Sequence, residues 1–283
     1  TSYFGAHDYI EYIPGNLPIL IVAPHGGSLT PAHLPIINTH GGDGGTQEST
    51  RLIIDSIMQF TNGCRPHVVI NRLKSNRFIA VGDMFRTGGF LPELHQTWLE
   101  YQNFIEIAKT SITDDWGAGH YFEMHTNAHP GDRTEVGLGV QASYLNQSDS
   151  VIRTRLNVST VKNLCTTVGA DFIDVIKGPN SLGSLIQSAG WNSTPSQVNP
   201  QPGTQGFFYS GLNMWRHGSR YAGVVDATHL ENWSGHINRS VNTAPYSGDL
   251  ASAMLKFMEA NYKYDFTNCD ATTSIDKAVE PAL

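Results

Sequence analysis

Apolar runs alternate along the chain with segments in which apolar residues recur at helical spacing. Residues 17–24, LPILIVAP, form a continuous apolar run with proline near each end, a pattern typical of a strand buried on both faces. Residues 49–60, STRLIIDSIMQF, have apolar positions at helical spacing, and Thr46 is a candidate N-cap. The first part of the chain is therefore predicted to be a strand, a long loop and a helix.

The same alternation continues to the end of the sequence. Strands are predicted at residues 67–73, 77–82, 120–125 and 221–231, and VGLGVQASY at 136–144 continues the pattern. Helices are predicted at 92–112, around 155–168, around 181–189 and at 248–262. Alternating strands and helices imply an α/β fold, a three-layer sandwich whose central sheet is mostly parallel or mixed.

No internal repeat or change in composition marks a second domain, so residues 1–283 are predicted to form a single α/β domain. Residues 190–220 are rich in Gly, Pro, Asn and Ser and also carry aromatic residues, which favours an ordered loop that covers a site. Residues 263–283 are expected to form an irregular C-terminal tail.

Composition and charge exclude several classes of protein. The net charge is −7 and Lys plus Arg number only 18, so the broad basic surface of a nucleic-acid-binding protein is missing. No apolar run approaches the roughly 20 residues of a membrane-spanning helix, so no membrane partner is expected. Nothing in the sequence indicates an oligomeric state.

Five Asn-x-Ser/Thr sequons favour a secreted glycoprotein whose signal peptide is absent from this chain. They lie at Asn146, Asn157, Asn192, Asn232 and Asn238. A glycan on Asn232 would crowd its neighbour Glu231, a candidate site residue introduced below, so this sequon is expected to be unmodified.

Three cysteines allow one disulfide, in any of three pairings, and leave one thiol. We expect Cys269 to attach the C-terminal tail, and Cys165, in the apolar stretch VKNLCTTVG, to be a buried thiol. The disulfide partner of Cys269, Cys64 or otherwise, stays open. Because no Cys-x-x-Cys spacing occurs, any metal would be held by histidines and carboxylates.

Two histidines follow predicted strands at the edge of the sheet where α/β proteins bind ligands. His25 comes directly after strand 17–24, within LIVAPHGGSL, and Gly26 and Gly27 allow a sharp turn there. His125 ends the strand at 120–125. Either one alone could be incidental, but two histidines at one edge favour a metal site.

A hydrolytic zinc ion commonly takes two histidines and one carboxylate and keeps a position open for water. Glu48, at a helix start after the glycine-rich THGGDGGTQE, is the predicted carboxylate, and the alternative is a first-turn Glu stabilised by the helix dipole. Glu123 should point to the same side of its strand as His125 and could orient that ligand.

These features resemble the N-formylglutamate amidohydrolase family over residues 17–235: APHGG at a strand end, Glu48 at a helix start, an Asn-Arg-rich strand pair and EMH at another strand end. That family is similar to phage poly-γ-glutamate hydrolases and, distantly, to zinc carboxypeptidases. The resemblance implies a zinc-carboxypeptidase-like fold and one zinc ion held by His25, Glu48 and His125.

The resemblance also implies a carboxylate base at a late strand end, where VVDATHLENW places Glu231. A glutamate there could take a proton from water and pass it to the leaving amine, whereas the alternative is an exposed strand-end acid. Asp226, deeper in the same strand, is expected to be structural. The other histidines, His229 among them, are expected to be surface or core residues.

An arginine that polarises the scissile carbonyl or holds a substrate carboxylate is also implied, and Arg77 best matches its position. The chain then reads AVGDMFR instead of the family's Asp-x-Asn-Arg-like run, which leaves a second arginine open. The candidates for it are Arg72, Arg86 and Arg133, and each could instead be a solvated surface residue. Asn127 and His129, in the following loop, could contact substrate.

The predicted function is a secreted, zinc-dependent amidohydrolase or peptidase. Its substrate would be an amide or peptide with a carboxylate or glutamyl group, of the poly-γ-glutamate or cell-wall peptide type. One alternative is a non-catalytic protein whose aromatic loop at 190–220 binds a glycan or peptide, and another is a metal-dependent esterase or deacetylase. The sequence has no Gly-x-Ser-x-Gly elbow and no Walker-type loop, which argues against serine and phosphate chemistry.

Overall fold

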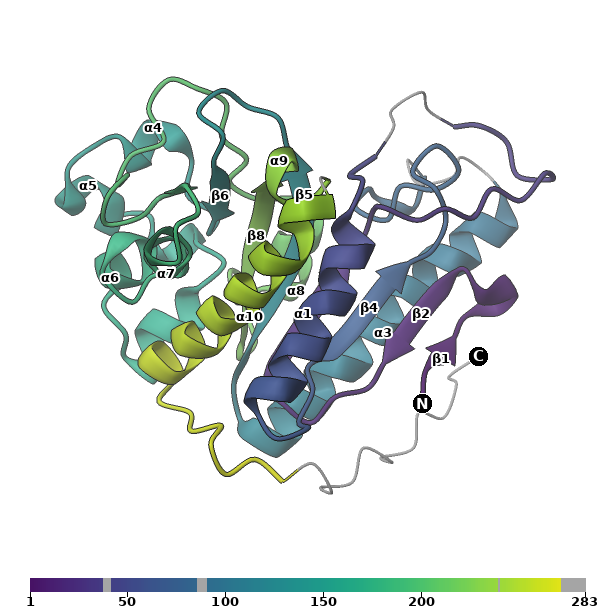
Figure 1. Cartoon of the computed structure of the whole chain (residues 1–283), viewed down its shortest axis with the longest axis horizontal. Coiled ribbons are helices and arrows are strands. Elements are labelled where there is room, and N and C mark those ends of the chain that lie inside the picture. The colour runs from purple at the N-terminus through teal and green to yellow at the C-terminus, as the bar shows by residue number, and fades with distance from the viewer. Residues whose placement is uncertain (38–41, 86–90, 239, 271–283) are drawn as a thin grey trace.

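The computed structural model describes residues 1–37, 42–85, 91–238 and 240–270. These residues form an eight-stranded sheet with the order β1-β2-β4-β3-β5-β8-β6-β7 (Figure 1). The strands are β1 Tyr3–Phe4, β2 Ile10–Ile13, β3 Ile19–Ala23, β4 His67–Asn71, β5 Gly119–Asn127, β6 Thr134–Gly137, β7 Ser193–Thr194 and β8 Val225–Trp233.

The centre of the sheet is parallel and its flanks are antiparallel. Strands β4, β3, β5 and β8 run in one direction, whereas β2 is antiparallel to β4 and β6 is antiparallel to β8. The predicted α/β fold with a mixed central sheet is therefore confirmed. Because the four central strands are parallel, their C-terminal ends meet at one edge of the sheet.

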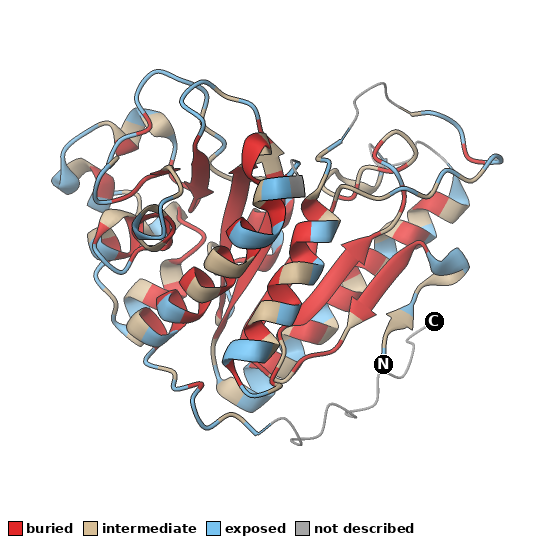
Figure 2. Ribbon diagram, in the orientation of Figure 1, coloured by how far each residue is buried: buried red, intermediate tan, exposed pale blue. Residues whose placement is uncertain are grey.

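Strand β3 shows why the sheet has a helical layer on each face. Ile19, Ile21 and Ala23 belong to the same core as residues of α1 (Thr46–Phe60) and α10 (Ser240–Tyr262), while Leu20 and Val22 pack with residues of α3 (Pro92–Trp116). Successive side chains of a strand point to opposite faces, so a wholly apolar strand supplies both cores. Figure 1 shows α1 and α10 in front of the sheet and α3 behind it, and Figure 2 shows the central strands buried.

Short helices make up much of the rest of the described chain. They are η1 Ala6–Asp8, α4 Ala142–Leu145, α5 Asp149–Arg153, η2 Leu156–Val158, the π-helix η3 Leu164–Val168, α6 Phe172–Lys177, α7 Leu182–Ser188, α8 Leu212–His217 and α9 Ser234–Ile237. Helices α4 to α7 gather beside β6 at one side of the sheet (Figure 1).

The predicted strand at 77–82 is wrong, because these residues form turns and irregular backbone. Phe78 and Ala80 are fully buried while their neighbours are half-buried. This gives the same two-residue alternation of burial as a strand. The backbone N–H groups of Arg77 and Phe78 bond instead to the carbonyl of Lys74, which closes a turn.

Other predicted elements differ in extent. The helix expected around 155–168 is divided between η2 and η3, α10 begins at Ser240 instead of residue 248, and the predicted loop at 190–220 contains β7 and α8. Thr46 is the first residue of α1, and Gly45 occupies the N-cap position that was predicted for Thr46.

The disulfide joins Cys64 to Cys269, with their Cα atoms 6.2 Å apart, and Cys165 is a free, half-buried thiol. The expected attachment of the C-terminal segment by Cys269 is thereby confirmed. Residues 263–270 have no helix or strand, and the rest of the predicted tail, 271–283, lies outside the described residues. Among the described helices, none combines the length and the apolar character that crossing a membrane requires.

Candidate metal centre

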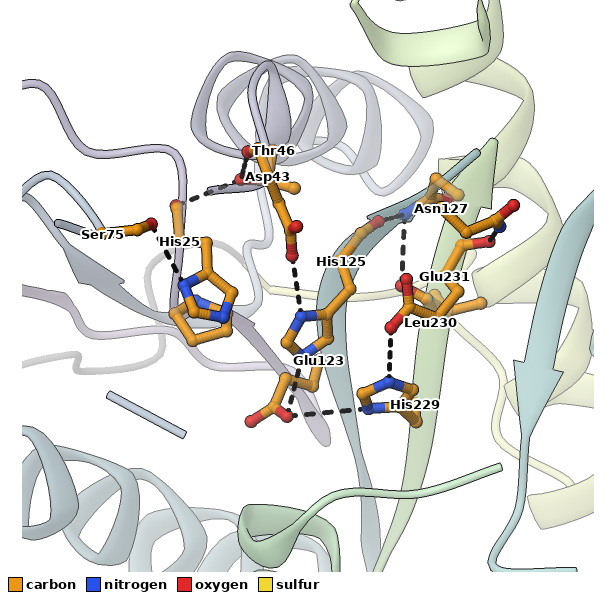
Figure 3. Close-up of polar contacts among 12 residues, drawn as sticks. His25, Asp43, Thr46, Ser75, Glu123, His125, Asn127, His229, Leu230 and Glu231 are labelled. Atoms are coloured by element: carbon orange, nitrogen blue, oxygen red, sulfur yellow. Dashed lines mark hydrogen bonds and ion pairs between the residues drawn. The ribbon is translucent and has the colours of Figure 1, made fainter. Parts of the chain in front are cut away.

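Three parallel strands deliver polar side chains to the same edge of the sheet (Figure 3). His25 lies just beyond β3, Glu123 and His125 lie on β5, and His229 and Glu231 lie on β8. The register of β5 and β8 pairs Glu123 with His229 and His125 with Glu231. Because alternate residues share a face, these four side chains lie on the same side of the sheet.

Gly26 allows the turn that follows His25. Its φ of +83° suits glycine, and a Cβ at this position would collide with the hydroxyl oxygen of Thr46. That hydroxyl donates hydrogen bonds to the carbonyls of His25, at 3.0 Å, and Asp43, at 2.8 Å. The first residue of α1 thus holds together the two segments that carry His25 and Asp43.

His25, Asp43 and His125 form a group with the composition of a hydrolytic zinc site. One ligand atom from each lies within 4.8 Å of the other two. Nδ1 of His125 is 2.9 Å from Oδ2 of Asp43, and the rings of His25 and His125 are 5.2 Å apart at their centroids. Two imidazoles and one carboxylate are a donor set that suits zinc.

Glu48, the carboxylate expected from the sequence, is not a member of this group. It is exposed on the first turn of α1, where Ser49 and Thr50 face the interior instead. Asp43 comes from the same glycine-rich segment, THGGDGGTQE, and supplies the carboxylate in its place. The sequence signal for Asp43 was its position between glycine pairs, which free the backbone to bring a short side chain to the site.

Glu123 holds His125 in orientation. Its Oε1 is 3.0 Å from Nε2 of His125, and its Oε2 accepts hydrogen bonds from the Asn213 amide, at 3.0 Å, and from the Tyr121 hydroxyl. A carboxylate on one ring nitrogen of a ligating histidine fixes the ring and leaves the other nitrogen for the metal. Here that other nitrogen is Nδ1, which faces Asp43.

Burial and neighbouring charges shift the pKa values of the site residues in different directions. Burial, with the nearby His125, lowers the pKa of His25 to about 4, so this ring is neutral at pH 7 and has a lone pair to offer. Burial also opposes the charged form of His125, but hydrogen bonds to Asp43 and Glu123 outweigh it and raise the His125 pKa well above its ordinary value. Burial disfavours ionisation of Glu123, yet the adjacent His125 and His229 hold its pKa well below the usual range.

Glu231 carries a carboxylate oxygen without a hydrogen-bond partner. Its Oε1 is 2.8 Å from Nε2 of His229, whereas its Oε2 is buried and unpaired in the described structure. The His229 ring packs against His125 with centroids 4.3 Å apart. His229 was expected to be an ordinary surface or core residue, and its spacing of two from Glu231 on a strand was the signal that could have identified it.

A cavity of about 320 Å³ opens between these groups. Its lining includes acidic and imidazole side chains at and beside the strand ends, and residues of the predicted loop at 190–220 also contribute. The lining residues are His25, Asp43, Val81, Glu123, His125, Thr126, Phe208, Ser210, Gly211, His229 and Glu231.

Comparison with solved structures shows which known proteins share this fold. No family model and no curated protein matches this sequence. Among solved structures, the gene product Atu2144 from Agrobacterium tumefaciens matches with a TM-score of 0.52 at 11% identity, over 89% of this chain and 95% of that one. The two chains share a fold.

Two further structures match less closely. An N-formylglutamate amidohydrolase from Ralstonia eutropha JMP134 has a TM-score of 0.46 at 11% identity, over 90% of this chain and 98% of that one. The catalytic domain of an N-acetylmuramoyl-L-alanine amidase from Bacillus (Paenibacillus) polymyxa var. colistinus has a TM-score of 0.35 at 8% identity, over 87% and 99%. The family that the sequence motifs resemble is thus represented among the matching structures.

The predicted arginines that fall within the described residues do not line the cavity. Arg77 donates to the carbonyl of Leu34, and Arg72 donates to the carbonyl of Asp8, at 2.8 Å, while packing over an aromatic ring. Arg86 lies outside the described residues. The contact of Arg77 with an oxyanion or a carboxylate stays a prediction, and in this structure its guanidinium holds the backbone at Leu34.

Arg133 and Asn127 support the surrounding chain instead of facing the cavity. Arg133 is largely buried and donates to the carbonyls of Pro202, at 2.9 Å, and Gly206, at 3.3 Å. Asn127 donates to the carbonyl of Glu231 at 2.6 Å and to that of Arg133 at 3.1 Å. Asn127 thus fixes the backbone of Glu231, and Arg133 fixes part of the loop at 190–220.

Proposed function

We propose that this protein is a zinc-dependent hydrolase of an amide or peptide bond. The observation that carries the proposal is the meeting of a two-histidine, one-carboxylate donor set with the unpaired carboxylate oxygen of Glu231 at one cavity. The proposed ligands are His25, Asp43 and His125. A metal site beside a free, buried base is the arrangement that hydrolysis of an unactivated amide requires.

Zinc at this position would supply a Lewis acid for the scissile carbonyl and lower the pKa of water. Glu231 would act as the general base and then as the general acid. Its Oε2 accepts a proton as the water oxygen bonds to the carbonyl carbon, and it returns that proton to the amine nitrogen as the C–N bond breaks. His229 holds Oε1, which leaves Oε2 as the oxygen without a partner.

The resemblance to N-formylglutamate amidohydrolases suggests a substrate with a carboxylate or glutamyl group, of the poly-γ-glutamate or cell-wall peptide type. The matching structures include enzymes named for the amides of N-formylglutamate and of N-acetylmuramoyl-L-alanine. An amide is the chemistry that these names share, and it is the substrate class that we propose.

A secreted location is also part of the proposal. The Cys64–Cys269 disulfide and the sequons support it, and Asn157 and Asn238 are exposed. Asn232 is fully buried, its amide donates to the carbonyl of His125 at 3.0 Å, and its oxygen accepts from the Tyr246 hydroxyl at 2.5 Å. A glycan at Asn232 would break these contacts, so this sequon should be unmodified.

Substitution of the base separates catalysis from metal binding. Glu231→Gln keeps the size of the side chain but cannot accept the proton, so we expect hydrolysis of peptide or γ-glutamyl amides to fall at least about 100-fold. The zinc content, measured by inductively coupled plasma mass spectrometry, should stay at the wild-type value. Glu48→Gln is the matched control, and it should change neither quantity.

Wild-type hydrolysis in Glu231→Gln would show that another group accepts the proton. Loss of zinc in Glu231→Gln would instead make Glu231 a ligand. A zinc-loaded wild-type protein that binds peptides or glycans but cleaves no amide in a broad panel would favour the non-catalytic alternative.

A further inference from the structure

Phe208, in the loop at 190–220, contributes an aromatic ring to the lining of the cavity. It lines the cavity, yet 46% of its surface is exposed to solvent. One side of the ring stacks on His129, with centroids 4.8 Å apart and planes inclined by 23°. A large apolar side chain that is held in place but left accessible is available to contact a ligand.

The backbone around Phe208, residues 206–211, crosses strand β6 as a fixed strap. The N–H of Phe208 donates to Oε2 of Glu135 at 2.8 Å, and Oε1 of the same carboxylate is 2.8 Å from Nδ1 of His129. The carbonyl of Tyr209 accepts from the N–H of Gly139 at 2.9 Å. Glu135 is fully buried, so one carboxylate fixes both the backbone of Phe208 and the ring beneath it.

Two glycines let the strap lie this close. A Cβ on Gly137 would lie 2.7 Å from the backbone of Tyr209, and a Cβ on Gly206 would lie 2.6 Å from the ring of His129. Atoms that close would force the strap or the histidine to move. The absence of side chains at these positions therefore sets the place of Phe208 over the cavity.

The described lining of the cavity offers no lysine or arginine to bind a substrate carboxylate. Asp43, Glu123 and Glu231 line the cavity. Val81 and Phe208 are its large apolar lining groups. A metal ion of charge +2 offsets part of the acidic charge next to the scissile carbonyl, but Phe208 lies on the loop side and offers no cation.

We propose that Phe208 is a specificity-determining residue and that the site prefers amides with an uncharged, apolar side chain beside the scissile bond. This inference rests on the proposed hydrolase function and specifies its substrate class. It differs from the glutamyl substrate that the family resemblance suggests. Contact of an apolar side chain with a pocket of this kind is worth roughly tenfold to 100-fold in kcat/KM.

Blocked peptides that differ at one residue beside the scissile amide test the proposal. With Phe, Leu, Glu or Lys at that residue, on either side of the bond, we expect zinc-loaded wild-type protein to favour Phe and Leu over Glu by at least about tenfold in kcat/KM. Phe208→Ala should remove most of this preference, and Phe208→Tyr should keep it. Tyr221→Ala, which removes another exposed aromatic ring, is the control and should leave the preference unchanged.

Binding to the metal-free protein supplies a readout that does not depend on turnover. Calorimetry with the same peptides should show tighter binding of the Phe peptide than of the Glu peptide, and Phe208→Ala should remove the difference. Hydrolysis with a preference for Glu, unchanged in Phe208→Ala, would overturn this inference and leave the hydrolase function standing. Absence of all hydrolysis would contradict the proposed function, while the binding comparison would still decide the role of Phe208.

Discussion

His125 makes one hydrogen bond to each of two carboxylates, Asp43 at 2.9 Å and Glu123 at 3.0 Å. The two contacts have different parts in the proposed site, since Asp43 would share the metal with His125 and Glu123 would hold the ring. The place of His25 and His125 at one edge of the sheet was predictable from the sequence because each follows or ends an apolar strand. Glu231 came from the family resemblance, and His229 was not identified. Asp43 was not identified, because its local signal, a position between two glycine pairs, does not by itself favour it over Glu48 as a candidate ligand.

Loss of the orienting carboxylate should weaken metal binding without abolishing it. Glu123→Gln removes the charge beside Nε2 of His125, and we expect zinc affinity to fall about tenfold to 100-fold. Competition with a chromophoric chelator measures that affinity, and Glu48→Gln should match the wild-type protein. An unchanged affinity in Glu123→Gln would show that His125 does not depend on this carboxylate.

At the scale of elements, β8 carries two acids at its two ends with different functions. Glu231 lies at the C-terminal end beside the cavity, while Asp226, near the start, is fully buried and accepts bonds from the Ser219 hydroxyl, at 2.5 Å, and the Tyr262 hydroxyl, at 2.8 Å. The structural role expected for Asp226 agrees with these contacts. Strand ends were predictable from apolar runs, but the segment at 77–82 was not, because a packed turn can bury every second residue.

Asp226 should make stability depend on pH in a defined direction. Burial raises its pKa from 3.8 to about 6. A raised carboxyl pKa stabilises the fold fully below pH 3.8, and that contribution is lost as the pH rises through about 6. Relative to Asp226→Asn, the wild-type free energy of unfolding should therefore fall by about 3 kcal/mol between pH 3.5 and pH 7.5.

Urea unfolding at a series of pH values measures this difference. The exposed Asp114→Asn should keep the wild-type pH dependence, which controls for the loss of a carboxylate as such. Parallel pH profiles for the wild-type protein and Asp226→Asn would contradict a raised pKa at Asp226.

At the scale of the whole molecule, the parallel centre of the sheet does most to build the site. It carries the ends of β3, β5 and β8 to one edge, although their site residues are far apart in sequence. The α/β class and the edge that holds the site followed from the alternation of apolar segments. The course of the long loop at 190–220 could not be predicted from the sequence. It depends on tertiary contacts of Glu135 and Arg133 with the backbone of the loop.

The identity of the third ligand tests the metal centre most directly. Zinc content per chain should be measured by inductively coupled plasma mass spectrometry on wild-type protein, Asp43→Ala and Glu48→Ala, each purified without chelator and confirmed as folded by circular dichroism. We predict about one zinc per chain in the wild-type protein and in Glu48→Ala, and a loss of most of the zinc in Asp43→Ala. Full zinc occupancy in Asp43→Ala, or no metal in the wild-type protein, would contradict this prediction.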